Sequence, residues 1–202
     1  PTTSLHLKDN ATAANTKLTV ERSALSYTGS YAASHCGSVT NNEFEIHTNN
    51  TLRVKIDNTG AVTMPAQPCV IARAVLGSAI PINTVTVIPL DSERADVGSN
   101  LANNTFTAPV TGKYLFTYTL YFLNIDSAAN SLGVQIVTSN KQYESWLSPD
   151  HIANADFFYT VSGSQIADMD VNDTLQYKAY CGGGTAQTTI HGDSQISIAL
   201  IC

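Results

Sequence analysis

The stretch that decides the fold is Thr105-Phe106-Thr107-Ala108-Pro109-Val110-Thr111-Gly112-Lys113-Tyr114-Leu115-Phe116. Proline cannot donate to a β-ladder and glycine accepts backbone angles that other residues avoid, so residues 109–112 predict a turn between two strands. Beyond the turn, apolar side chains occupy every second position, which is the period of a strand with one buried face. These positions are Tyr114, Phe116, Tyr118, Leu120 and Phe122. We therefore expect a long core strand here rather than a helix.

The spelling Phe-x-Ala-Pro-x-x-Gly-x-Tyr-x-Phe at residues 106–116 resembles the central motif of the globular head of complement C-one-q, a trimeric jelly roll that is similar to tumour necrosis factor. Looser likenesses lie in residues 86–91, 97–100, 172–175, 190–192 and 196–201. Asn172 and His191 depart from the Gly and the aromatic or Ser that are usual there. The resemblance covers residues 69–202 and implies a jelly-roll head. Given its regular alternation, we expect the aromatic stripe to form core and trimer interface rather than a ligand site; it comprises Tyr114, Phe116, Tyr118 and Phe122.

The chain has 202 residues, of which 13% are charged, and a net charge of −6. This length can bury a core as one large or two small domains. Thr, Val, Ile, Asn and Ser are frequent and helical apolar periods are rare, so the composition favours an all-β protein. No window approaches eighteen apolar residues, and we expect no membrane insertion. The acidic excess lies after residue 66 without any Lys/Arg cluster, so nucleic acid is not an expected partner.

Residues 1–66 predict four short polar strands. These are Ser4–Lys8, Lys17–Glu21, Glu43–Thr48 and Leu52–Ile56. The last two offer one narrow apolar stripe each, which is less than a small domain needs for a core of its own. We therefore expect the segment to be stabilised by wrapping around two further copies of itself, as a shaft.

A second resemblance lies in residues 50–62, which match the phrase Asn-x-x-Arg-x-x-Ile-Asp-x-x-Gly-x-Val that recurs in tail-fibre and tailspike proteins of tailed bacteriophages. In this phrase Ile56 ends a strand, residues 57–60 form a turn, and Val62 begins the return strand. Residues 64–68, Met-Pro-Ala-Gln-Pro, predict a stiff, extended linker. The predicted fold is thus all-β: a short interwoven trimeric β shaft over residues 1–66, followed by a jelly-roll β-sandwich head over residues 67–202.

Together the two resemblances imply a viral host-recognition protein on the virion, outside the cell. We expect the chain to form the homotrimeric tip of a phage tail fibre. This tip is expected to bind a bacterial cell-surface receptor, a glycan, during adsorption. No cofactor is expected. Two alternatives stay open: a secreted lectin or defence protein similar to C-one-q, and a purely structural fibre segment without receptor contact.

Trp146 is the only tryptophan, and it lies in the polar stretch 140–151. An aromatic ring beside polar side chains can stack on a sugar while hydrogen bonds fix the sugar hydroxyls. The candidate receptor-binding residues are Tyr143, Trp146, Asp150 and His151. A structural role for Trp146, as a plug of the core or of the trimer seam, is the favoured interpretation of this residue. The glycine-rich loop 181–189 is a further candidate for a variable recognition surface.

The inventory for catalysis is poor, because the five histidines are scattered and neither a serine elbow nor a His-Glu-x-x-His helix occurs. Asp150 and Asp156 are the one pair of acids worth weighing as glycosidase carboxylates, and solvated loop acids are the favoured interpretation. The sequence therefore predicts no enzyme.

The alternating acids Asp168, Asp170 and Asp173 resemble the start of a calcium loop. An EF-hand would need Gly where Asp173 stands and Glu where Ala179 stands, so an acidic turn between two strands is favoured over a metal site. The four widely spaced cysteines predict structural thiols, and a disulfide between Cys69 and Cys202 is the alternative.

Overall fold

The structure, a computed structural model, describes residues 41–152 and 158–202. The chain divides into the units Pro1–Asn42 and Glu43–Cys202, and every element below belongs to the second. The predicted strands Ser4–Lys8 and Lys17–Glu21 lie outside the described residues. Regular structure in the described part is β apart from one 3-10 turn, η1 (Pro149–His151). The predicted all-β class is thereby confirmed. In this part of the chain no helix is long and apolar enough to cross a membrane.

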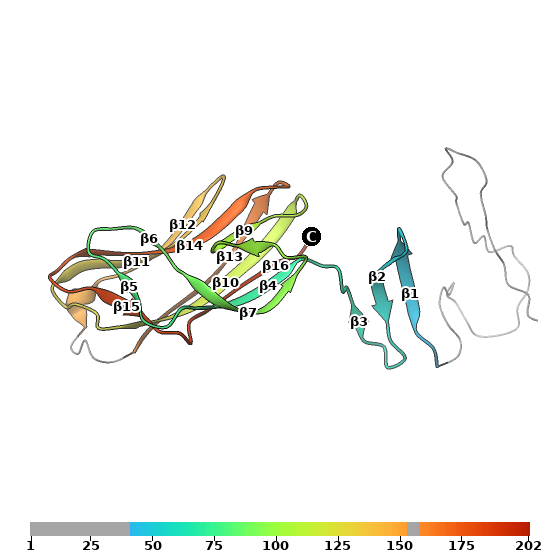
Figure 1. The fold of residues 1–202 in the computed structure, drawn as a ribbon, viewed down its shortest axis with the longest axis horizontal. Helices are drawn as coiled ribbons and strands as arrows, with labels where there is room; N and C mark the ends of the chain where they lie inside the picture. The colour runs from blue at the N-terminus through green and yellow to red at the C-terminus, as the bar shows by residue number, and fades with distance from the viewer. Residues whose placement is uncertain (1–40, 153–157) are drawn as a thin grey trace, which may run out of the picture. The chain divides into compact units, whose positions relative to one another are not determined.

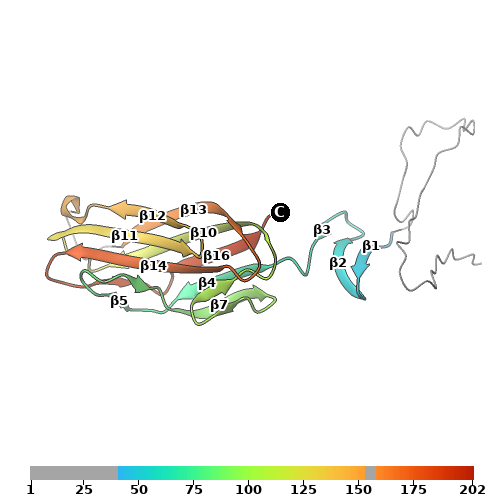
Figure 2. The same ribbon diagram turned by 90° about the horizontal axis from the view of Figure 1, so that it is seen from above.

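Two sheets form a β-sandwich, the head (Figure 1). The β10 sheet contains β4 (Cys69–Ala74), β5 (Ser78–Ile80), β7 (Leu90–Val97), β10 (Gly112–Leu123), β13 (Tyr159–Met169), β15 (Thr188–Ile190) and β16 (Gln195–Leu200). The β11 sheet contains β6 (Thr86–Val87), β8 (Leu101–Ala102), β9 (Thr105–Thr107), β11 (Ala129–Thr138), β12 (Gln142–Leu147) and β14 (Thr174–Gly183). Figure 2 shows β12, β11 and β14 side by side, with β12 at the edge of its sheet. β13 pairs with β10 along its whole length.

The chain passes from one sheet to the other at the Pro/Gly corner. β9 pairs with β14 in the β11 sheet, and after residues 108–111 the chain continues as β10 in the other sheet. Ala108 N–H donates to the Asp173 carbonyl at 2.8 Å, and the Tyr114 hydroxyl donates to the Val110 carbonyl at 2.8 Å. These bonds fix the corner, because they satisfy polar groups that no ladder reaches. The predicted turn and long strand are confirmed.

The aromatic stripe of β10 fills the space between the sheets. Its four aromatic side chains are at most 4% exposed. The ring of Phe106 on β9 meets that of Tyr114 edge to face at 5.5 Å, so the corner also joins the two layers. The predicted role of Tyr114, Phe116, Tyr118 and Phe122 as core is confirmed; their role in a trimer interface stays a prediction.

A separate small sheet precedes the head. It contains β1 (Phe44–Thr48), β2 (Thr51–Ile56) and β3 (Val62–Thr63) in antiparallel order. Asp57 Oδ1 accepts the backbone N–H of Thr59 at 2.8 Å and of Ala61 at 2.9 Å, which closes the turn between β2 and β3. The strand, turn and return strand predicted from residues 50–62 are confirmed.

The expectation about the link to the head is corrected, whereas the described cysteines are free thiols, as the favoured interpretation predicted. The predicted extended linker is a turn, in which Gln67 N–H donates to the Met64 carbonyl at 3.0 Å. The Gln67 side chain donates to the Leu200 carbonyl at 2.9 Å, so this turn is tied to β16 rather than held out as a spacer. Cys69, Cys181 and Cys202 are all free thiols, and the alternative disulfide between Cys69 and Cys202 is not formed.

Candidate functional site

Strand β12 carries two of the four residues predicted to bind a receptor, and it separates them. Successive side chains of a strand point to opposite faces of the sheet. Tyr143 faces inward, where its ring meets Phe116 edge to face at 5.4 Å. Trp146 lies on the outer face and is 50% exposed. The structure therefore does not bring these two rings to one surface, and Trp146 does not plug the core of this chain.

Trp146 occupies a row of residues that crosses three strands. Gly133 on β11 is the register partner of Trp146 on β12 and of Tyr180 on β14. A Cβ atom at Gly133 would lie 2.6 Å from two carbons of the Trp146 ring, which is closer than real contacts allow. The indole and the Tyr180 ring meet edge to face, with centroids 6.0 Å apart. Glycine at this position thus lets the indole lie against the strand backbone.

Glu144 fixes the polar edge of the indole. Its Oε2 accepts the Trp146 Nε1–H at 2.9 Å, and its Oε1 accepts the Gln135 amide at 3.2 Å and the Gln142 amide. Gln135 is only 8% exposed, so its side chain is held in place by the sheet. With Lys178, the register partner of Gln135 on β14, these residues form a polar row beside the aromatic one.

The other two predicted receptor-binding residues lie just beyond β12, on the turn η1. Asp150 and His151 are exposed, and His151 Nε2 lies 3.8 Å from Asp150 Oδ1. The buried Pro149 anchors the turn. Asp156, the partner of Asp150 in the glycosidase alternative, lies outside the described residues.

The three acids of the calcium alternative do not converge. Asp168 pairs with Lys113 on β10. Asp173 Oδ2 accepts the Asp170 N–H at 2.8 Å and the Asn140 amide at 2.6 Å. Over residues 41–152 and 158–202, no three His, Cys, Asp or Glu residues are gathered to hold a metal ion. Residues 170–173 form a turn between β13 and β14, as the favoured interpretation predicted.

The glycine-rich loop after β14 is held by one carboxylate. Asp126 accepts the backbone N–H of Ala186 and of Ala128, both at 2.8 Å, and also that of Thr185. These hydrogen bonds, that of Thr185 first, lower the pKa of Asp126 to about 2, because they favour the charged carboxylate. Gly184 has φ +81°, a backbone conformation that favours glycine.

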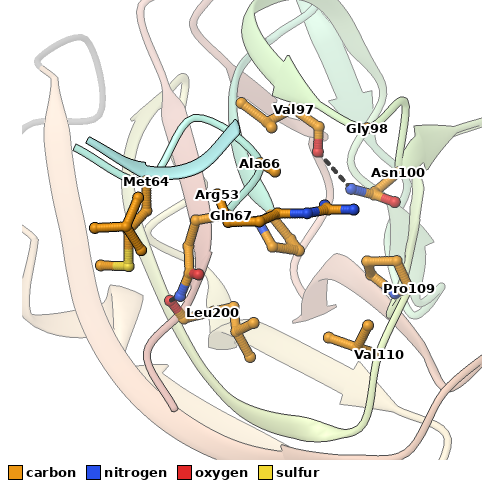
Figure 3. A pocket seen from close by; sticks show the side chains of 12 residues that line it. Arg53, Met64, Ala66, Gln67, Val97, Gly98, Asn100, Pro109, Val110 and Leu200 are labelled. Carbon is orange, nitrogen blue, oxygen red and sulfur yellow. Dashed lines mark hydrogen bonds between the residues drawn. The ribbon is translucent and has the colours of Figure 1, made fainter. Parts of the chain in front are cut away.

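The described residues line two hollows. One, of about 430 Å³, is lined by residues that include Arg53 of β2, Met64, Pro109 and Val110, and in Figure 3 its Asn100 amide donates to the Val97 carbonyl at 2.7 Å. A second cavity, of about 380 Å³, is lined by Tyr121, Phe158, Thr160, His191, Asp193 and Gln195. In the second cavity Asp193 is paired with Arg73.

Solved structures share the fold of the head. The globular domain of the zebrafish complement 1qA protein is 14% identical, aligns with 67% of this chain and 98% of its own, and has a TM-score of 0.52. Murine APRIL is 10% identical, aligns with 67% of this chain and 99% of its own, and has a TM-score of 0.50. The head is a jelly roll like those of C-one-q and the tumour necrosis factor family. At these identities the likeness shows the fold alone. No protein-family model and no curated protein matches the chain.

Apart from the ion pair between Lys113 and Asp168 at one end, the outer face of the β10 sheet carries no charge on three neighbouring strands. The uncharged outward positions include Leu115, Thr117, Thr119 and Tyr121 on β10, Ser197 and Ala199 on β16, and Thr160, Ser162, Ser164 and Ile166 on β13. Ile166 is 54% exposed. We call this surface the uncharged face. Depletion of charge is a mark of protein interfaces, whereas an ordinary solvent face carries Lys and Glu.

Sequence reasoning found Trp146 but missed Gly133, Glu144, Gln135 and Tyr180. One signal was available for Gly133, because a glycine inside a strand pattern indicates close approach of another group. The partners of Trp146 could not be read from the sequence, since they depend on the register of three strands.

Proposed function

We propose that this protein is the homotrimeric tip of a bacteriophage tail fibre. Its head binds a receptor on the bacterial surface during adsorption, and we expect this receptor to be a glycan. The observation that carries the proposal is the order of two parts in one chain. The hairpin with the tail-fibre phrase ends at Thr63, and the first strand of a jelly-roll head starts at Cys69. Such a protein would lie on the outside of the virion, with residues 1–66 as the shaft and 67–202 as the head.

The small sheet supports assembly from several copies. The register places Phe44, Ile46, Val54, Ile56 and Val62 on one of its faces. Ile46 is 47% exposed and Val62 is 60% exposed. A short three-stranded sheet with its apolar face open has little stability of its own. Two further copies would cover this face, as in a threefold shaft.

The uncharged face of the head supports the same assembly. Its hydroxyl and apolar side chains can pack against another copy without leaving a buried charge unpaired. A trimer then presents three identical receptor sites on one rigid tip, which turns weak single contacts into strong attachment through avidity.

Two measurements test the proposal. Light scattering of the purified protein should give three times the 21.5 kDa mass of the chain. Labelled protein should bind saturably to a subset of a panel of bacterial strains, and it should compete with the adsorption of tailed phages that infect those strains. A trimer that binds no strain and blocks no phage would leave the structural fibre segment as the function.

The secreted C-one-q-like protein is kept as a second candidate, because the two structural relatives are animal proteins. It predicts binding across unrelated bacteria or to host immune proteins, without competition with any phage. The adsorption assay separates the two candidates.

A further inference from the structure

We infer that the outer face of the β11 sheet around Trp146 is a carbohydrate-binding platform, on which a pyranose ring stacks against the indole, and that Gly133 is the residue that positions the indole. The inference rests on the proposed function insofar as it takes a bacterial surface glycan as the ligand. It adds the face of the head that binds the glycan and the residues that surround the indole there. These are Gly133, Gln135, Glu144 and Tyr180.

The indole is held in place before any ligand arrives. Gly133 provides the space beneath the ring, as the 2.6 Å distance to a Cβ atom there shows. The Nε1–H bond to Glu144 fixes the rotation of the ring, and Tyr180 closes one side. An aromatic surface that is ordered in advance loses little conformational entropy on binding.

The chemistry around the ring fits a sugar. A pyranose offers an apolar C–H face for stacking and a rim of hydroxyl groups that need donors and acceptors. Next to the half-exposed indole stand the Glu144 carboxylate and the amides of Gln135 and Gln142, and Lys178 on β14 is the register partner of Gln135. A lipid or an apolar helix would instead remove these polar groups from water without offering them any further hydrogen bond, which is costly.

The platform lies on the opposite side of the sandwich from the uncharged face. Trp146 belongs to the β11 sheet, and the uncharged face is the outer side of the β10 sheet (Figure 2). Assembly through the uncharged face therefore leaves the platform open to solvent in every copy. Three platforms on one tip are what avid binding to a repeating surface polysaccharide requires.

The test is direct because Trp146 is the only tryptophan in the sequence, so all indole fluorescence of the protein comes from this residue. The full protein is first screened on a printed array of bacterial and animal glycans. The strongest glycan is then titrated against Trp146 fluorescence. We expect a saturable change in emission with the wild-type protein.

Four variants separate binding from folding. Trp146→Ala should weaken the glycan at least about tenfold, as expected for an aromatic hot spot, and Trp146→Phe should recover part of the loss. Gly133→Ala keeps every polar group but forces the indole to move, so it should also weaken binding by about tenfold. Leu76→Ala is the control, because Leu76 is 68% exposed and lies outside the platform. Since Trp146→Ala and Trp146→Phe both remove the fluorophore, their affinities are measured by calorimetry.

The alternative role of Trp146 is to cover Gly133 and stabilise the sheet. In that case the Trp146 variants lower the melting temperature but bind the glycan as the wild type does, and the inference is overturned. An array without any bound glycan also overturns it. If the protein still adsorbs to bacteria in that case, the proposed function stands without the platform. If Trp146-dependent glycan binding occurs but no bacterium is bound, the platform stands and the phage function falls.

Discussion

Asp126 illustrates how one side chain organises the distal loops of the head. Its carboxylate accepts N–H groups from both Ala128, just beyond it in its own turn, and residues 185–186 of the glycine-rich loop. Hydrogen bonds to the ionised form lower its pKa to about 2 from the ordinary 3.8. The loop 181–189, predicted as a recognition surface, is therefore anchored at its middle by a charge.

This anchoring makes stability depend on pH in a defined window. Because the folded-state pKa of Asp126 is lowered, its contribution is present in full above the unfolded value of 3.8 and is lost as pH falls toward about 2. Asp126→Asn should lower the melting temperature at pH 6, and the difference from wild type should shrink between pH 4 and about 2. Thermal melts across this range measure it. Asp150→Asn is the control, and an equal pH dependence in both variants would contradict the assignment.

At the scale of elements, β10 connects the layers of the head. It joins the Pro/Gly corner to β13 on one side and β16 on the other, and its aromatic stripe fills the core. β12 illustrates the same alternation at the surface, with Tyr143 directed inward and Trp146 outward. The two were grouped as one candidate site from their closeness in sequence, although the period of a strand separates residues three apart.

Phe116→Ala should destabilise the head by about 3–5 kcal/mol, because it removes a fully buried ring and leaves a cavity against Tyr143. Chemical denaturation measures the change. Phe158→Ala removes a ring that is 57% exposed and should cost much less. Similar losses in the two variants would mean that the stripe is not the main support of the core.

At the scale of the whole molecule, the two apolar or uncharged surfaces indicate assembly. The small sheet exposes one apolar face, and the head presents the uncharged face on β10, β13 and β16. Either surface alone is compatible with a monomer that exposes one apolar or uncharged face to solvent. Their occurrence together in one chain supports the proposed homotrimer.

Ile166→Lys should dissociate the proposed trimer or prevent its formation, because it adds a charge to the uncharged face where a partner would bury it. The mass from light scattering should fall toward that of one chain. Val171→Lys is the matched control: Val171 is also exposed, at 52%, but lies in the turn after β13. A trimer of unchanged mass with Ile166→Lys would place the interface elsewhere.

Much of the architecture was predictable because its signals are local. The corner at residues 109–112, the buried stripe that follows it and the turn at residues 57–60 each depend on a few adjacent residues, whose turn chemistry and two-residue period are written in order along the chain. The turn at residues 64–67 was not predicted, since the bond from Gln67 to the Leu200 carbonyl comes from the far end of the head.

The sequence by itself determined the all-β class, the core strand of the head and the presence of one tryptophan, Trp146, in a polar stretch. Only the tertiary structure decided what surrounds that aromatic. Gly133, Trp146 and Tyr180 belong to three different strands and meet because the register of β11 with β12 and with β14 aligns them. Register is set by the summed packing of whole strands across the sandwich, and no short stretch of sequence contains that sum.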